Sequence, residues 1–189
     1  MPTPSNMIPL GTEAPSFSLL DSLSNNMVSF PDQKLNVATV ILFICNHCPY
    51  VQHILPKLIE IANLYQQKEV RFIAISSNDA NTYPEDSFQN MSREARDKQF
   101  PFPYLYDETQ SVAKAYQAAC TPDFYIFDKT GRCAYHGRFD SSTPGNKEPV
   151  TGTDLTQALE HLIAGHPVPL DNQKPSLGCS IKWLSVNPA

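Results

Sequence analysis

The 189-residue sequence lacks the patterns of several large classes of protein. Its net charge is −5 and it has no run of Lys and Arg, which argues against a nucleic-acid partner. The longest apolar run, near residues 37–45, is too short to span a bilayer, so we expect no membrane partner. Residues 1–10 lack the basic start and long apolar stretch of a signal peptide. We therefore expect a soluble, cytoplasmic protein.

Cysteine and glycine are also scarce. Five cysteines in a chain of this length do not form a disulfide framework, and their odd number leaves at least one outside any intramolecular pair. The 7 glycines contrast with 17 prolines, which are spread along the chain rather than gathered in one tract. Hydrophobic residues make up 41%, as in globular proteins. We expect a single domain over residues 1–189, with a core at about 8–165 and an irregular tail at 166–189.

Hydrophobic spacing predicts an α/β fold with a central mixed sheet flanked by helices. Buried strands at 37–44 and 70–75 flank a helical pattern at 51–65, and such a unit predicts parallel pairing of its two strands. Two short strands at 17–20 and 27–30 predict an N-terminal hairpin. The other elements expected are helices at 86–98 (capped by Asp86 or Ser87), 108–119 and 154–164, and strands at 104–106, 124–127 and 133–139.

The stretch Cys45-Asn46-His47-Cys48-Pro49 carries the clearest chemical signal. Two cysteines two residues apart follow a buried strand and precede a helical pattern. A helix N-terminus favours the thiolate, the nucleophilic form of cysteine, so we expect the pKa of Cys45 to be lowered. A structural zinc site would normally need a second close pair of ligands, whereas Cys120, Cys133 and Cys179 are isolated in the sequence. The pattern therefore favours a redox dithiol over zinc.

Six stretches that cover nearly the whole chain carry a family resemblance. They are Gly11–Phe17, Cys45–Tyr50, Ser77–Asp79, Phe102–Asp107, Thr121–Pro122 and Gly178–Trp183. On these residues the chain resembles the thioredoxin superfamily, in its peroxiredoxin-like (redoxin-domain, AhpC/TSA-like) branch. The resemblance implies a thioredoxin-like fold and thiol chemistry that needs no cofactor.

The resemblance also implies roles for the motif residues. Cys45 would be the attacking thiol, and Cys48 the resolving thiol that closes an internal disulfide. In disulfide isomerases a histidine before the second cysteine, here His47, stabilises the first thiolate and makes the couple more oxidising; the alternative is an exposed histidine without a role. Thr121-Pro122 resembles the family's cis-proline segment, whose preceding residue pairs its backbone with an extended substrate.

The three remaining cysteines have less certain places. Cys120 precedes the Thr121-Pro122 segment and is either a third redox thiol or a small buried residue. Cys179 lies in the tail and could fold back as an extra resolving thiol or bond Cys120. Cys133 is expected to be structural, because it lies in an alternating strand.

Two features of the family are missing. Peroxiredoxins present Pro-x-x-x-Thr-x-x-Cys around the reactive thiol; if Cys48 matches that thiol, Ile41 and Cys45 stand at the Pro and Thr positions, which argues against a peroxidase. Thioredoxins keep a buried carboxylate that accepts a proton below the cysteines, but no acid occurs between residues 35 and 44. The sequence therefore leaves the proton acceptor unassigned.

The favoured function is a thiol–disulfide oxidoreductase that acts through Cys45 and Cys48. Its partners would be protein or small-molecule disulfides and thiols, with a thioredoxin or glutathione system as the reductant, and the protein would be a monomer or homodimer. One alternative is a peroxiredoxin-like peroxidase that passes through a sulfenic acid. The other is a metal- or cluster-binding protein that uses Cys45, Cys48 and Cys120.

Overall fold

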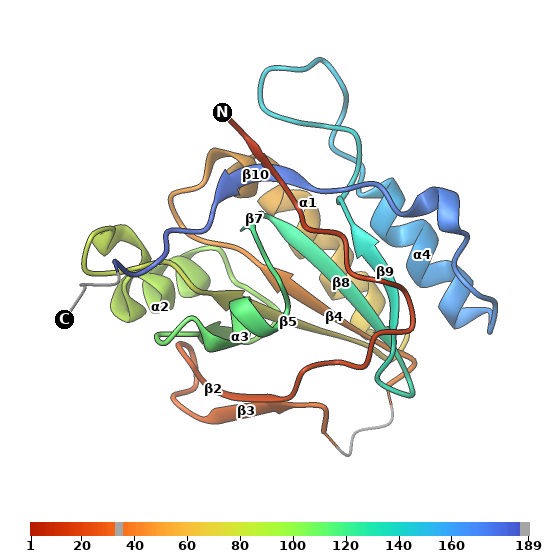
Figure 1. Ribbon diagram of the computed structural model, residues 1–189, viewed down its shortest axis with the longest axis horizontal. Coiled ribbons are helices and arrows are strands. Elements are labelled where there is room, and N and C mark those ends of the chain that lie inside the picture. Colours follow the sequence, from red (N-terminus) through yellow and green to blue (C-terminus); the bar gives the residue numbers. More distant parts are fainter. Residues whose placement is uncertain (33–35, 186–189) are drawn as a thin grey trace.

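The computed structural model describes residues 1–32 and 36–185 of the chain. Its centre is a seven-stranded mixed sheet in the order β3-β2-β6-β5-β4-β8-β9 (Figure 1). Strands β4, β5 and β6 run parallel, and the pairings of β2, β3, β8 and β9 are antiparallel. The strands of this sheet are β2 (Phe17–Asp21), β3 (Met27–Phe30), β4 (Ala38–Phe43), β5 (Val70–Ser76), β6 (Tyr104–Tyr106), β8 (Asp123–Asp128) and β9 (Cys133–Gly137). The predicted α/β class and mixed sheet are confirmed.

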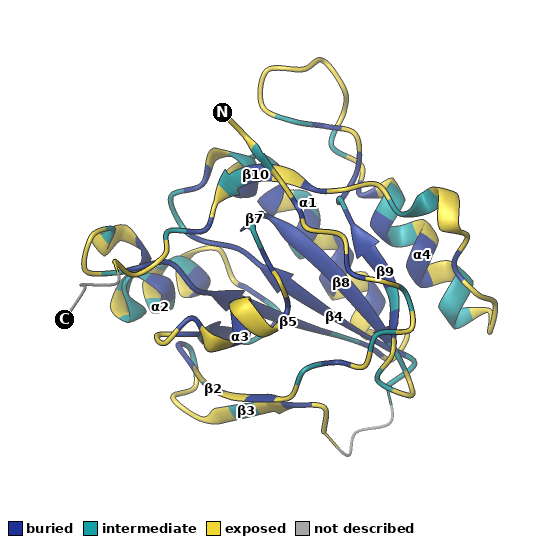
Figure 2. Cartoon of the chain, viewed as in Figure 1, coloured by how far each residue is buried: buried dark blue, intermediate teal, exposed yellow. Residues whose placement is uncertain are grey.

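Two apolar cores lie on the two faces of this sheet. Helices α1 (Pro49–Gln66), α2 (Phe88–Asp97) and α4 (Thr153–Ile163) pack on one face, and the short α3 (Ser111–Ala115) packs on the other. Strand β4 contributes to both cores, because successive side chains of a strand point to opposite faces. Figure 2 shows the central strands as buried, which agrees with the continuous apolar run in this part of the sequence.

Helix α3 is shorter than the predicted helix at 108–119. The Asp107 carboxylate accepts hydrogen bonds from the backbone N–H groups of Val112 and Ala113, at 3.3 and 2.9 Å, which places the first turn after residue 110. Gln110 and Gln117 have left-handed backbone conformations, with φ of 61° and 54°. A left-handed residue interrupts an α-helix, so the helical segment is confined between these two positions.

A second, three-stranded sheet lies over the end of the first. Its order is β1-β10-β7, with β1 at Thr3–Pro4, β10 at Leu177–Ser180 and β7 at Cys120–Thr121. Both pairings are antiparallel. The tail that was expected to be irregular therefore contains a strand, and it also contains the 3₁₀ helix η2 (Leu170–Asn172). The small sheet joins segments near both ends of the chain to the segment that precedes β8 (Figure 1).

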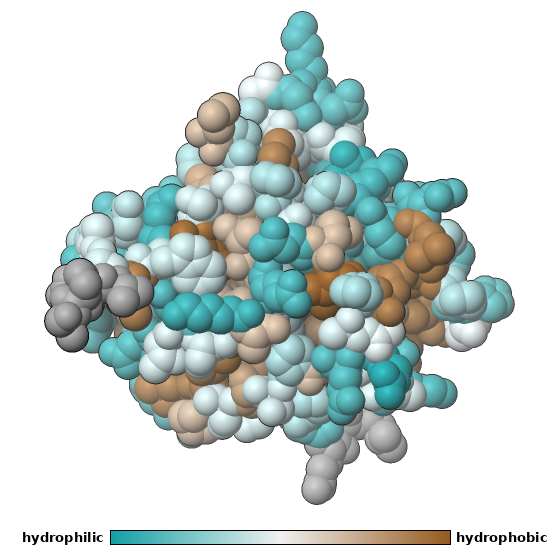
Figure 3. Space-filling view, in the orientation of Figure 1, coloured by the Kyte–Doolittle hydropathy of each residue, from teal (hydrophilic) through white to brown (hydrophobic). Residues whose placement is uncertain are grey.

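The surface carries scattered apolar side chains rather than one large apolar face. Leu20 and Met27 are exposed on the β2–β3 hairpin, and Trp183 is exposed beyond β10. Figure 3 shows hydrophobic atoms over this hairpin and in smaller groups among hydrophilic ones. Within the described part of the chain, no helix has the length and hydrophobicity needed to cross a membrane.

Candidate active site

The two cysteines of the Cys-x-x-Cys motif lie between β4 and α1. Cys45 follows the end of β4, and Cys48 is the N-cap residue of α1, with Pro49 in the first helical position that proline favours. Both are free thiols and both are buried, with 2% of Cys45 and none of Cys48 exposed to solvent. The structure therefore brings the predicted dithiol together at the entry to a long helix.

The Thr121–Pro122 segment lies against both thiols, and its peptide bond is cis. Strands β4 and β8 are antiparallel with Phe43 opposite Asp123, so the residues before β8 run beside those that follow β4. The Cys45 sulfur is 3.5 Å from the hydroxyl of Thr121. The Cys48 thiol donates a hydrogen bond to the backbone oxygen of Thr121, at 3.2 Å. Thr121 is thus the residue that the two thiols share.

The structure lowers the pKa of Cys48, not that of Cys45. Hydrogen bonding from Cys45 is the largest cause, and donors at Thr121, Cys179 and the Val51 backbone add to it, so the pKa of Cys48 falls to about 5 although burial opposes the shift. The same hydrogen bond raises the pKa of Cys45, as do burial and the charge of Asp86. The shift at Cys45 is therefore opposite to the expected one, because hydrogen bonding with Cys48 and burial both favour its protonated form.

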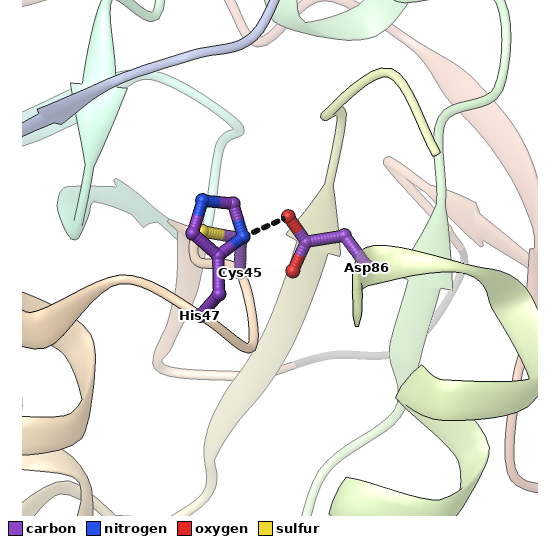
Figure 4. Close-up of side chains that lie close together, drawn as sticks. All are labelled: Cys45, His47 and Asp86. Atoms are coloured by element: carbon purple, nitrogen blue, oxygen red, sulfur yellow. Dashed lines mark ion pairs between the residues drawn. The ribbon is translucent and has the colours of Figure 1, made fainter. Parts of the chain in front are cut away.

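His47 contacts a buried carboxylate that the sequence did not identify as part of the site. Its Nδ1 atom is 2.7 Å from an oxygen of Asp86, a residue that is fully buried, whereas 27% of the His47 side chain is exposed (Figure 4). Among the described residues Nδ1 has no hydrogen-bond partner, so the contact is an ion pair when the imidazole is protonated. The ring also stacks on Tyr83, with centroids 5.4 Å apart. His47 therefore has a fixed position between the thiols, the acid and solvent.

Asp86 belongs to the 3₁₀ helix η1 (Pro84–Asp86), and Ser87, not Asp86, is the cap of α2. The carboxylate accepts hydrogen bonds from the backbone N–H of Asn46 and from the side chain of Asn78, both at 2.7 Å. One sequence signal could have found it. The carboxyl ends of parallel strands meet at one edge of a sheet, so polar residues that follow β5 approach the residues that follow β4.

The same side chains are a candidate metal-ligand set. A sulfur of Cys45, a ring nitrogen of His47 and a carboxylate oxygen of Asp86 lie within 4.8 Å of one another. This group, the one found among the described residues, includes neither Cys48 nor Cys120, which the sequence had offered as ligands. Both oxygens of Asp86 also accept hydrogen bonds, from Asn46 and Asn78, which fix the carboxylate beside His47.

The other three cysteines lie in different environments. Cys120 and Cys133 are buried, and burial raises the pKa of both, that of Cys133 to about 12. Cys179 is partly exposed and lies directly opposite Thr121 in the β10–β7 pair. Burial and hydrogen bonding with Cys48 raise the pKa of Cys179 to about 11. Of the two additional candidates, Cys179 is therefore the one in contact with the dithiol.

A cavity of about 270 Å³ opens on the far side of Pro122. Tyr50, Ile54, Phe139 and Leu177 contribute apolar walls to it. Because Tyr50 and Ile54 belong to α1 and Leu177 to β10, the cavity lies between the helix that starts at the dithiol and the strand that covers Thr121. It offers space for an apolar group next to the redox centre.

Comparison with known proteins places the chain among similar structures. It is 54% identical to an uncharacterized conserved protein from Geobacillus kaustophilus, with a TM-score of 0.95 over 100% of this chain and 98% of the other. A hypothetical protein from Sinorhizobium meliloti 1021 is 43% identical, with a TM-score of 0.93 over 97% and 99% of the two chains. A putative thioredoxin from Neisseria meningitidis is 26% identical, with a TM-score of 0.61 over 79% and 88%.

No curated protein matched the chain. The AhpC/TSA family model matches residues 10–136, which is more than half of the sequence. The fold, the position of the dithiol and this match agree: the chain belongs to the AhpC/TSA family and has a thioredoxin-like fold.

Proposed function

We propose that the protein is a thiol–disulfide oxidoreductase that uses the Cys45–Cys48 dithiol. The family and the thioredoxin-like fold support an oxidoreductase in general terms. The observation that carries the finer proposal is the pairing of two thiols, with pKa values shifted in opposite directions, against Thr121. The two thiols titrate as a coupled pair that can share one proton, and hydrogen bonding within the pair makes Cys48 its more acidic member.

In the first step Cys45 attacks a client disulfide. Its sulfur bonds to one client sulfur, the client S–S bond breaks, and the second client sulfur leaves as a thiolate. The proton of Cys45 passes along the hydrogen bond to the Cys48 thiolate, which acts as the base. Cys45 is given this role because its sulfur lies within 4.8 Å of a ring nitrogen of His47, whose side chain is partly exposed.

In the second step Cys48 resolves the mixed disulfide. Its sulfur attacks the Cys45 sulfur, the bond to the client breaks, and the proton of Cys48 goes to the departing client sulfur. The client has then gained two electrons, and the dithiol has become a disulfide. A lowered pKa at Cys48 stabilises the reduced protein relative to the oxidised one, which makes the couple more oxidising.

His47 and Asp86 would exchange protons between the site and solvent. His47 is partly exposed and Asp86 is not, so the imidazole is the member of the pair that solvent can reach. An imidazole can both accept and donate a proton, which suits it to protonate the first client thiolate that leaves. This assignment supplies the proton-transfer group that the sequence left open.

The proposed clients are protein or small-molecule disulfides, with a cytoplasmic thioredoxin or glutathione system as the reductant. The cavity beside Pro122 would accept an apolar group of the client. Reduction of insulin disulfides with a dithiol donor tests the proposal. Cys45→Ser should abolish the reaction, and Cys133→Ala, which changes a buried thiol outside the site, should retain it. Equal activity of Cys45→Ser and the wild type would refute the proposal.

A second candidate is a peroxidase centred on Cys48. The lowered pKa of Cys48, at a helix N-terminus, is what favours it. The Cys48 thiolate would attack a peroxide oxygen, the O–O bond would break, and the other oxygen would leave with a proton as water or an alcohol, which leaves Cys48 as a sulfenic acid. Cys45 would then condense with the sulfenic acid to release water and form the disulfide. Peroxide consumption that persists in Cys45→Ser but is lost in Cys48→Ser, without insulin reduction by the wild type, would select this reaction.

A further inference from the structure

Strand β10 occupies the position that a client peptide would be expected to take. An extended substrate was expected to pair with the backbone of Thr121. In the structure β10 already pairs with this backbone, in antiparallel orientation. The register places Cys179 opposite Thr121 and Ser180 opposite Cys120. A cysteine of the chain itself therefore lies where a client cysteine would be presented to the dithiol.

Gly178 allows this close approach. A Cβ atom at this position would lie 2.0 Å from the backbone oxygen of Thr121 and 3.2 Å from the ring of Pro122. Contact at such distances with backbone atoms is possible only for glycine. The residue next to Cys179 thus holds β10 directly on the Thr121–Pro122 segment.

The segment after β10 is fastened at several points. The backbone N–H of Ile181 donates to the oxygen of Ala119, at 3.0 Å, and Asp79 N–H donates to the oxygen of Lys182, at 2.8 Å. The Asn78 side chain accepts a hydrogen bond from the N–H of Lys182 and donates one to Asp86. One asparagine therefore joins this segment to the carboxylate that contacts His47, so β10 is part of the site's architecture.

Cys179 is more exposed to solvent than the two cysteines of the Cys-x-x-Cys motif. Cys45 and Cys48 are almost completely covered, whereas Cys179 is partly exposed and packs against the core cluster that contains Cys48. A thiolate of a reductant attacks a disulfide more readily at an accessible sulfur than at a covered one. Cys179 provides such a sulfur beside Cys48.

We propose that Cys179 is the third thiol of the redox centre, an internal client through which the reductant reaches the dithiol. The proposal rests on the proposed Cys45–Cys48 disulfide. The Cys179 sulfur attacks Cys48, a Cys48–Cys179 bond forms, the Cys45–Cys48 bond breaks, and Cys45 takes the proton that Cys179 loses. No electrons enter or leave in this exchange. A thiolate of the reductant then attacks Cys179, a bond between the reductant and Cys179 forms, and Cys48 departs as a thiolate, which its lowered pKa favours. A second thiolate of the reductant attacks the reductant sulfur of this mixed disulfide, so that the reductant leaves as a disulfide and Cys179 departs as a thiolate that takes up a proton.

Disulfide mapping of the full-length protein tests the proposal. Cys45→Ser removes the competing partner of Cys48, and oxidised glutathione supplies the oxidising equivalents. After an acid quench and digestion, mass spectrometry should find the peptides of Cys48 and Cys179 joined by a disulfide. Glutathione attached to Cys48, with no such joined peptide, would overturn the proposal.

Two substitutions in β10 test whether the exchange depends on the close approach of this strand to Thr121. Gly178→Ala should displace β10 and abolish the joined peptide in the Cys45→Ser background, because its Cβ has no space beside Thr121. Ser180→Ala changes an exposed side chain of the same strand and should keep the joined peptide. An equal yield of joined peptide from both would mean that the β10 geometry does not control the exchange.

Cys179→Ser distinguishes this proposal from the proposed function. Its Cys45 and Cys48 are intact, so oxidation should still join these two cysteines. Suppose that the Cys45–Cys48 disulfide forms in Cys179→Ser while no Cys48–Cys179 disulfide forms in Cys45→Ser. In that case the proposal for Cys179 fails and the oxidoreductase proposal stands. If Cys45 and Cys48 form no bond in any variant, the oxidoreductase proposal itself fails.

Discussion

The described part of the chain contains two His–Asp pairs, and they have opposite surroundings. His47 and Asp86 are 2.7 Å apart beside the dithiol, and 27% of the His47 side chain is exposed. His136 and Asp123 are 3.1 Å apart, and both side chains are completely buried. The same two residue types therefore occur in one region that solvent reaches and in one that it does not.

In the buried pair both ring nitrogens of His136 form hydrogen bonds. His136 Nδ1 accepts a hydrogen bond from the backbone N–H of Ile8, at 3.1 Å, so Nε2 carries the hydrogen and donates it to Asp123. The ring also stacks on Tyr125, with centroids 3.9 Å apart. This pair fastens the N-terminal segment to β8 and β9. His47 instead keeps a partly exposed ring, so exposure and free hydrogen-bonding capacity, not the residue pair itself, separate a proton-transfer site from a structural one.

The largest expected difference is in the thiols of the two regions. The pKa of Cys48 is lowered to about 5, and burial raises that of Cys133, three residues before His136 in β9, to about 12. The ultraviolet absorbance of thiolate, measured as the difference between the reduced wild type and each Cys→Ala variant, should show these two midpoints. Midpoints that coincide near the ordinary value of 9.0 would remove the contrast between the regions.

These shifts act on stability with opposite signs. Because Cys48 binds its proton more weakly in the folded state, its contribution is lost as the pH falls to about 5 and grows as the pH rises towards 9.0. Cys133 binds its proton more tightly in the folded state, so its contribution is lost as the pH rises from 9.0 to about 12. Urea unfolding of the reduced wild type and of each Cys→Ala variant across these ranges measures both signs.

Removing the buried histidine should cost the most stability. His136→Leu leaves the N–H of Ile8 without its acceptor and Asp123 without one of its donors, and each buried polar group left unsatisfied typically costs about 1–3 kcal/mol. Insulin reduction per folded molecule should not change. Urea unfolding checks the first statement, and an unaltered free energy of unfolding would show that the pair is not structural.

Removing the exposed histidine should do the reverse. His47→Gln is expected to slow insulin reduction about 100-fold, the lower end of what general acid–base catalysis contributes. Its free energy of unfolding should change by less than about 1 kcal/mol, since the side chain is partly exposed. Steady-state rates over a range of pH and urea unfolding of the same variant make the test. A large loss of stability with normal rates would assign His47 a structural role.

The smallest effect is expected at Tyr83, on which the His47 ring stacks with an interplanar angle of 7°. Tyr83→Leu removes this contact, and aromatic pairs contribute about 1 kcal/mol beyond their buried area. Insulin reduction should fall by less than in His47→Gln, with the same dependence on pH. A fall as large as that of His47→Gln would mean that the stacking, rather than the imidazole, sets the rate.

The parts of the site that the sequence predicted are close to one another in the chain or match a family pattern. Cys45, Cys48 and His47 lie in one loop, and Thr121–Pro122 was expected from the resemblance alone. The elements that hold them, β4, β5 and α1, have continuous apolar or helical spacing and were predicted within a few residues of their observed bounds. Local pattern was sufficient because buried strands and amphipathic helices are coded locally.

The parts that the sequence missed depend on contacts between distant segments. Asp86 reads as a helix cap, and only the approach of η1 to the Asn46 backbone reveals its contact with His47. Cys179 had two possible partners in the sequence, and only the register of β10 against β7 places it by Cys48 rather than leaving the choice open. Local spacing contains no information about such pairings, which the sheet order decides.

The position of β10 in the chain has a consequence for synthesis on the ribosome. Cys45, Cys48 and Thr121 are made well before Leu177–Ser180, so a growing chain has its dithiol and its Thr121 edge before the strand that covers them. An uncovered edge is open to any extended segment that meets it. Until β10 is made, the chain therefore lacks the strand that pairs with this edge in the folded protein.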